Sequence, residues 1–157
     1  MELTHLDDSG RPRMVDVGTK HATARTATAE GVIHMSQKAY DSVEGTDGPK
    51  GNVLRTAEIA GTMAAKKTHD LIPLCHPIGL DHAEVRATLA PELPGVRVRA
   101  TTKVTARTGV EMEALTGVTV ALLTVYDMVK GLGHDLEIGQ IRLVEKLGGK
   151  SGDWRRA

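Results

Sequence analysis

The stretch EALTGVTVALLTVYDMVK, residues 113–130, decides much of the fold, because its apolar residues recur at the spacing of an α-helix. One stripe is formed by residues three or four positions apart, namely Leu115, Val118, Leu122, Val125 and Val129. The other faces also carry apolar or small residues, among them Val120, Ala121, Leu123 and Met128. We therefore expect a helix over about 111–131 that is covered on nearly all sides and ends at Gly131 and Gly133.

Asp127 is the only charged residue of this helix between Glu113 and Lys130. A buried carboxylate costs several kcal/mol, roughly, unless it is paired or hydrogen-bonded. Lys130 lies three residues further on, on nearly the same face, and can supply that pairing. Burial and a charged neighbour both shift pKa values, so the pair is a candidate for proton transfer. A structural ion pair near a helix end explains the pattern equally well.

Alternating segments flank the long helix and predict strands. Residues 83–90 and 96–106 alternate apolar and polar side chains on either side of a turn, PELPG, which predicts a β-hairpin. Residues 22–34 alternate more weakly, and residues 137–146 form a last strand after the long helix. Four strands are therefore expected.

Two helical segments are expected between the first strand and the hairpin. Ser36 is a suitable N-cap for a short helix through Val43. After the glycine-rich loop 45–51, which carries Lys50 near its tip, a helical pattern runs over 54–70. The prolines of LIPLCHP, residues 71–77, end it.

This order of elements predicts an α+β fold, a ferredoxin-like βαββαβ sandwich with a four-stranded antiparallel sheet and the helices on one face. We expect one domain over residues 1–157. Residues 1–20 and 148–157 are polar and unpatterned, so flexible arms are expected there.

Composition restricts the possible functions. Equal numbers of basic and acidic residues and only three aromatic ones argue against a nucleic-acid-binding module. Cys75 is the single cysteine, which fits a reduced, cytoplasmic setting. No apolar run reaches the length expected of a membrane span, and no signal-peptide pattern opens the chain. An alanine-rich core buries little apolar surface, so oligomerisation would help.

The densest group of reactive side chains is KKTHDLIPLCHP, residues 66–77. Lysines such as Lys66 at a helix end are usually solvated, which is the ordinary explanation for them. The loop behind it is more informative, because Pro73 and Pro77 stiffen the backbone around Leu74, Cys75 and His76. A rigid loop that presents a histidine is suited to clamp a substrate.

Other site types are less well supported by this segment and by the C-terminus. Adjacent Cys75 and His76 cannot easily face one ion, and no second cluster completes a tetrahedral set with His69, so no metal site is predicted. No sequence feature marks a general base that would activate Cys75 as a nucleophile, so we expect Cys75 to be a small buried thiol. GGKSG near the C-terminus lacks the spacing of a phosphate-binding P-loop.

Charged residues elsewhere are candidates for ligand contacts. Glu111 and Glu113 open the long helix, where acids complement the helix dipole and where a carboxylate could also accept from a guanine-type edge. Glu113 and Asp127 are separated by about 21 Å along an ideal helix, so a site using both spans an extended ligand or is built from two chains. Candidates for phosphate contacts are Lys50, Lys66, Lys130 and Arg25, with Lys150 as a weaker one.

Four stretches carry a resemblance to a known family: LTHLDDSGRPRMVDV, KGNVLRTAEIAGTMAAKKTHDLIPLCHP, TGVEMEALTGVTVALLTVYDMVK and IGQIRLVEKLGGKSGD. Together they cover nearly the whole chain. The sequence resembles the molybdenum cofactor biosynthesis protein C (MoaC) family, the cyclic pyranopterin monophosphate synthases. The resemblance implies a ferredoxin-like fold, a hexamer built as a trimer of dimers with the site at a dimer interface, and no redox cofactor.

The resemblance also implies a reaction and the residues that perform it. Members of this family rearrange 3′,8-cyclo-7,8-dihydro-GTP to cyclic pyranopterin monophosphate and release diphosphate. Asp127 matches the active-site acid of the family, and its site lysines match Lys50, Lys66 and Lys130. Its substrate-contacting stretches match Leu74, Cys75 and His76, and Met112 with Glu113. Two alternatives remain, an oligomeric effector-binding module without catalysis and a zinc-dependent hydrolase.

Overall fold

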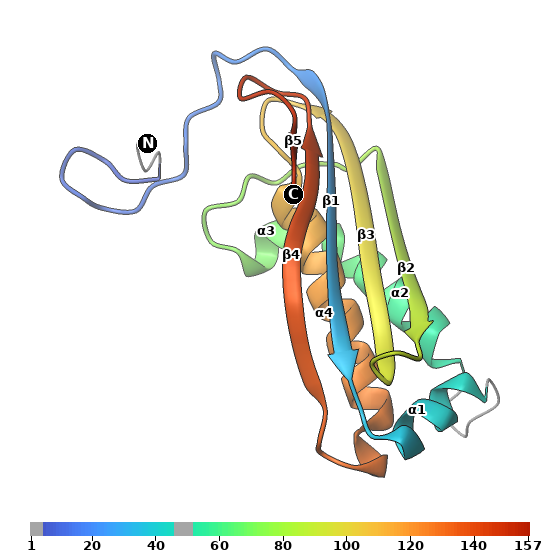
Figure 1. Ribbon diagram of the computed structural model, residues 1–157. Coiled ribbons are helices and arrows are strands. Elements are labelled where there is room, and N and C mark those ends of the chain that lie inside the picture. The colour runs from blue at the N-terminus through green and yellow to red at the C-terminus, as the bar shows by residue number, and fades with distance from the viewer. Residues whose placement is uncertain (1–4, 46–51) are drawn as a thin grey trace.

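A computed structural model of the chain describes residues 5–45 and 52–157 (Figure 1). Its strands are β1 (Thr23–His34), β2 (His82–Ala90), β3 (Gly95–Ala106), β4 (Glu137–Leu147) and β5 (Trp154–Arg155). Its helices are α1 (Gln37–Glu44), α2 (Val53–Ala65), α3 (Thr68–Leu71) and α4 (Glu111–Val129), followed by the 3₁₀ turn η1 (Lys130–Leu132). The elements confirm an α+β architecture.

Within the described residues the strands form one antiparallel sheet in the order β2-β3-β1-β4-β5. The predicted count of four strands was therefore wrong, because β5 adds a fifth. This strand lies in the tail 148–157, for which the sequence predicted a flexible arm, and it pairs Trp154 with Lys146 and Arg155 with Glu145. Two residues are too few for an alternating pattern, so the sequence carried no strand signal there.

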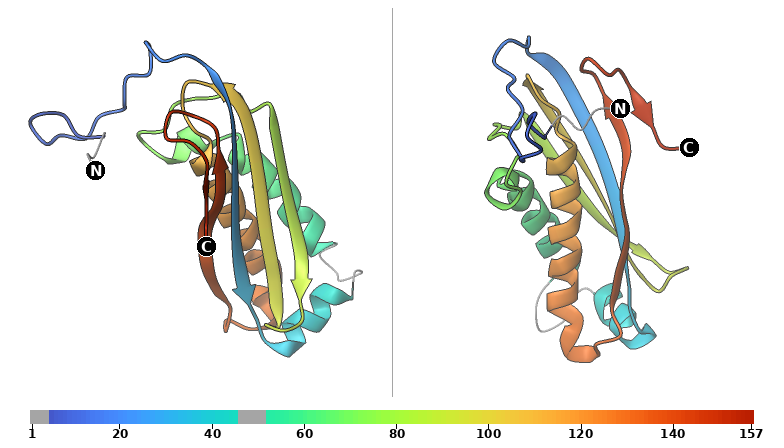
Figure 2. Two further views of the ribbon diagram at one scale, coloured as in Figure 1. Left: turned by 45° about the horizontal axis from the view of Figure 1, so that its top comes forward. Right: turned by 90° about the vertical axis from the view of Figure 1, so that its left-hand side faces the viewer.

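The long helices α2 and α4 lie on one side of the sheet, and the other side of the sheet is not covered by any helix in the views (Figure 2). α4 packs against β1, β3 and β4, while α2 packs against α4 and β2. The core between the layers consists of small and branched side chains. Fully buried examples are Ile33, Val96, Val98, Val118, Leu122 and Val125.

Two glycines allow α2 and α4 to approach each other closely. A Cβ atom added at Gly61 of α2 would lie 2.6 Å from the carbonyl oxygen of Gly117 in α4. No side chain fits between backbones at that separation. The two helices therefore depend on glycine at this crossing, and the position of α4 on the sheet depends on the crossing.

The helix predicted over 54–70 ends earlier than expected. α2 stops at Ala65, and the chain continues through Lys66 and Lys67 into the single turn α3. The hydroxyl of Thr68 donates to the carbonyl oxygen of Ala65 at 3.0 Å, so a side chain satisfies a carbonyl that the helix leaves open. This break turns the next loop toward the N-terminal end of α4.

By length and hydropathy alone, the helix Glu111–Leu132 could cross a membrane, contrary to the sequence expectation. Half of its most apolar 18-residue window is buried inside the molecule. A core helix of a soluble protein passes the same test, so this finding is weak support for a membrane span.

Candidate functional site

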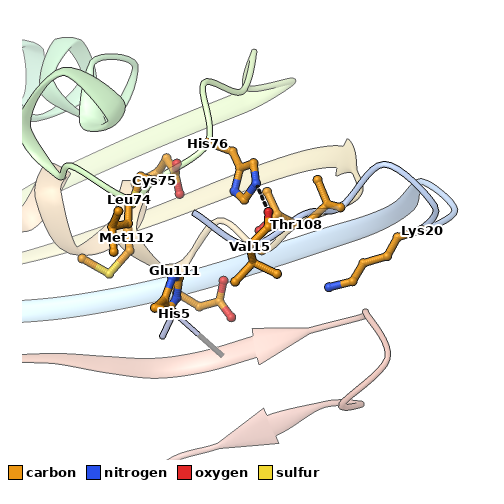
Figure 3. A pocket seen from close by; sticks show the side chains of 12 residues that line it. His5, Val15, Lys20, Leu74, Cys75, His76, Thr108, Glu111 and Met112 are labelled. Atoms are coloured by element: carbon orange, nitrogen blue, oxygen red, sulfur yellow. Dashed lines mark hydrogen bonds between the residues drawn. The ribbon is translucent and has the colours of Figure 1, made fainter. Parts of the chain in front are cut away.

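A cavity of about 400 Å³ lies at the N-terminal end of α4 (Figure 3). The loop before β2 contributes Leu74, Cys75 and His76, and the first turn of α4 contributes Met112 and Glu113. These are five of the six residues predicted from the sequence to contact a substrate. Two segments that are far apart in the sequence thus meet around one space.

The loop that carries His76 is held in place at both ends. The amide of Cys75 donates to the carbonyl oxygen of Ile72 at 3.1 Å, which closes a tight turn after α3. The Nε2–H of His76 donates to the carbonyl oxygen of Val15 at 2.7 Å, because a carbonyl can only accept (Figure 3). His76 therefore has one ring nitrogen committed to the N-terminal arm, and the residue lines the cavity.

Residues of the N-terminal arm, which no sequence pattern marked as site residues, form part of the remaining wall. His5, Val15, Val17 and Lys20 line the cavity together with Thr108, Gly109 and Glu111. The arm was expected to be mobile because it shows no periodicity, and periodicity reports only regular elements. The family-like stretch LTHLDDSGRPRMVDV was the one available signal that this arm has a role.

Glu113 is the most perturbed acid of the cavity. The residue is buried, with only 4% of its surface exposed. Burial raises the pKa of its carboxyl from 4.5 to about 7, its own backbone amide opposes the rise, and the charge of Glu111 adds to it. Burial, and then the Glu113 carboxylate, also raise the pKa of the Cys75 thiol. The cavity therefore holds a carboxyl that can exchange a proton near neutral pH and a thiol that stays protonated.

Arg25, the sixth predicted substrate contact, lies beside the main cavity and does not line it. It borders a small hollow together with Lys146 and Glu111, and this hollow shares Gly109 and Glu111 with the main cavity. The Nε–H of Arg25 donates to the carbonyl oxygen of Ala106 at 3.2 Å. The Nζ of Lys146 lies 3.9 Å from a carboxylate oxygen of Glu111. Two cations thus stand at the rim of the site.

Asp127 and Lys130 lie at the opposite, C-terminal end of α4. They are paired as expected, with 2.6 Å between Nζ and Oδ1, but their side chains are 68% and 52% exposed. The expected burial of Asp127 was therefore wrong for the single chain. Leu123, one helical turn earlier, is 52% exposed as well, so this face of α4 points away from the sheet.

The Asp127 carboxylate raises the pKa of Lys130, first through their hydrogen bond and then through its charge. A raised pKa keeps the ammonium protonated at neutral pH. Within one chain, the protonated Lys130 side chain can offer a positive charge but cannot accept a proton. Desolvation is what lowers the pKa of a lysine, and this exposed surface does not supply it.

Lys66, another predicted catalytic lysine, is not brought into the cavity. Lys66 caps the C-terminal end of α2, is exposed, and does not line the cavity. Lys50 lies outside the described residues. His69, weighed as a metal ligand, instead approaches its neighbour Asp70 at 3.4 Å. Over residues 5–45 and 52–157, no three side chains of ligand type gather into a candidate metal site.

Comparison with known proteins places the chain in a family. The model of the MoaC family matches residues 14–149. Over 153 residues, the chain is 54% identical to the cyclic pyranopterin monophosphate synthase of Roseiflexus sp. (strain RS-1), with 98% of this chain and 97% of that protein covered. The synthase of Novosphingobium aromaticivorans is 54% identical over 99% of this chain and 98% of its own length. That of Brucella ovis is 51% identical, over 98% and 93%. The chain belongs to the MoaC family.

Proposed function

We propose that this chain is a cyclic pyranopterin monophosphate synthase of molybdenum cofactor biosynthesis. It would convert 3′,8-cyclo-7,8-dihydro-GTP to cyclic pyranopterin monophosphate and diphosphate. The observation that carries this proposal is that the chain is 51–54% identical, over nearly its whole length, to relatives that bear this name. The cavity supports it, because five residues predicted as substrate contacts line one space.

The residues of the cavity suit a rearrangement that moves protons and charge. Glu113, with a pKa near 7, can accept a proton from an amino-bearing ring or return one to it. His76 is held by the Val15 carbonyl, so its ring is oriented before a ligand arrives. Leu74 and Met112 supply apolar walls. Arg25 and Lys146, which line the small hollow beside the cavity, would stabilise phosphate charge.

The predicted residues Asp127, Lys130, Lys66 and Lys50 would complete the site from a second copy of the chain. Asp127 and Lys130 occupy an exposed face of α4 with Leu123, and α2 beside it exposes Ile59 and Met63. Exposed apolar side chains next to charged ones are typical of surfaces that another subunit covers. We propose a hexamer built as a trimer of dimers, in which such contacts bury Asp127.

Two further proposals follow from the same family assignment. The elements β1 to β4 with α2 and α4 would form a ferredoxin-like unit, to which β5 is added at the edge. The protein would act in the cytoplasm on a small nucleotide-derived molecule. The effector-binding module is not favoured, since the relatives carry the name of an enzyme.

The experiment is incubation of the purified full chain with 3′,8-cyclo-7,8-dihydro-GTP, followed by mass analysis of the nucleotide. Wild type is expected to form the pterin and diphosphate. Asp127→Asn and Lys66→Ala should reduce turnover by at least a hundredfold, whereas Lys67→Ala, a change at the exposed neighbouring lysine, should leave it nearly intact. Bound but unchanged nucleotide with wild type would support the effector-binding module instead. Turnover like wild type in both site variants would reject these residues.

A further inference from the structure

We propose that Gly149, in the turn after β4, is a positioning residue that seats the Arg25 guanidinium as a ligand for the diphosphate end of the substrate. This inference rests on the proposed function for the identity of the anion. The proposed role of Gly149 would give a structural function to the GGKSG segment, which is not a P-loop, and to the short strand β5.

The turn is held in one conformation by contacts at both ends. Gly148 and Gly149 have φ angles of +80° and +83°, which side-chain-bearing residues rarely adopt. The amide of Gly148 donates to a carboxylate oxygen of Asp153 at 2.8 Å, and the amide of Gly152 donates to the carbonyl oxygen of Gly149 at 3.1 Å. The chain then returns along β4 as β5. The Cα of Gly149 is therefore fixed relative to the sheet.

Arg25 lies directly against this turn. A Cβ atom built at Gly149 would be 2.5 Å from Nη1 of Arg25 and 3.1 Å from its Cζ. On another side, the Nε–H of Arg25 donates to the carbonyl oxygen of Ala106. The guanidinium thus occupies a slot between a carbonyl group and a glycine, and only a residue without a Cβ leaves that slot open. Any side chain at position 149 pushes the guanidinium out of it.

The surroundings favour an anion of the phosphate class. Arg25 shares its hollow with Lys146, and the Glu111 carboxylate near Lys146 leaves the pair with a net positive charge. Within the described part of the chain, the Nε–H is the only Arg25 group that donates a hydrogen bond, so both terminal nitrogens remain for a ligand. A planar guanidinium with two such nitrogens matches phosphate oxygens. The shared border with the main cavity allows one molecule to reach both.

The test compares two glycines of the same turn. Gly149→Ala adds a methyl group against Arg25, while Gly152→Ala adds one at a φ of +70° with nothing within 4 Å. Both substitutions strain the backbone similarly, but only the first displaces the guanidinium. Inorganic diphosphate is titrated calorimetrically into the full chain. We expect about tenfold weaker binding for Gly149→Ala and less than a twofold change for Gly152→Ala, because a hydrogen bond to a charged group is lost in the first case alone.

A second arm separates positioning from simple damage to the fold. In an Arg25→Ala background, Gly149→Ala should weaken diphosphate binding no further, since both changes remove the same contact. If Gly149→Ala does not fold, Gly149→Asn and Gly152→Asn replace the pair, because asparagine tolerates positive φ. The inference would be overturned if Gly149→Ala and Arg25→Ala weakened diphosphate binding additively, or if the substitutions at Gly149 and Gly152 weakened it equally. It would also be overturned if wild type did not bind diphosphate. Turnover of the nucleotide by wild type tests the proposed function separately, so the two failures are distinguishable.

Discussion

Glu113→Gln should make the folded protein more stable at pH 8, although it removes a residue of the candidate site. Burial raises the pKa of this carboxyl from 4.5 to about 7. That rise means that ionising the carboxyl costs roughly 3 kcal/mol more in the folded state than in the unfolded chain. A neutral amide of nearly the same shape avoids the cost.

The sign of the pH dependence follows from which state binds the proton. Below about pH 4.5, the carboxyl is protonated in both the folded and the unfolded chain, and it costs no stability. Between pH 4.5 and pH 7 the unfolded chain loses the proton first, so the free energy of unfolding of wild type falls as the pH rises. Above pH 7 the full penalty is present. The advantage of Glu113→Gln should therefore grow mainly between pH 4.5 and pH 7 and change little above that range.

The assay is urea unfolding followed by circular dichroism at pH 5 and pH 8, at one protein concentration. Glu111→Gln is the matched control, because Glu111 lies in the same helical turn but is only half-buried. We expect a gain for Glu113→Gln of about 2–3 kcal/mol at pH 8 over its value at pH 5, and a much smaller one for the control. A gain that does not change with pH would refute the assignment of the penalty to ionisation of Glu113.

Two further predictions concern the helix crossing and the assembly. Gly61→Ala should destabilise the protein by about 1–3 kcal/mol, because the added Cβ atom meets the carbonyl oxygen of Gly117. Calorimetry should show a lower melting temperature for this variant than for the control Gly131→Ala, whose added Cβ atom has nothing within 4 Å. If the site is shared between subunits, mixing inactive Asp127→Asn with inactive His76→Ala after joint refolding should restore roughly a quarter of wild-type turnover, since half the dimers then carry one intact site. Absence of recovery in verified mixed dimers would show that both residues serve the site from one chain.

Sequence patterns predicted the parts of the fold that repeat over many residues. The hairpin of β2 and β3 was expected over 83–90 and 96–106, and the strands lie within one residue of those bounds. The Ser36 cap was also confirmed, since its side chain accepts a hydrogen bond from the amide of Ala39. These features depend on alternation or on a local hydrogen bond, and both are visible in the order of residues.

Features that depend on a few individual contacts were missed. The break at Lys66 involves a hydrogen bond from Thr68 to Ala65, and the strand β5 pairs only two residues with β4, so no periodic signal marks either of them. The burial of Asp127 was inferred from apolar neighbours on its own helix. Burial depends on what covers the helix, and within the described part of the single chain the face that carries Leu123 and Asp127 stays exposed.

The candidate site shows the same division between local and distant information. His76 and Glu113 were singled out because a rigid loop and a helix start are local features, and the fold then brings both to one cavity. The wall formed by Val15 and Lys20 was not foreseen, since an arm without periodicity gives no indication of what it contacts. Only the resemblance to a family pointed to that segment.

The predicted site residues that α4 carries lie at its two ends, and this separation has a physical consequence. Glu113 and Asp127 are fourteen residues apart on a continuous helix, so about 21 Å of rise separates them and no bending of a packed helix brings them together. A buried acid at one end and an exposed ion pair at the other cannot act on one atom within a chain. A second chain whose α4 runs antiparallel to the first would place each exposed pair beside the partner's cavity. Such an arrangement would also cover Leu123, so apolar burial would favour the contact that completes the site.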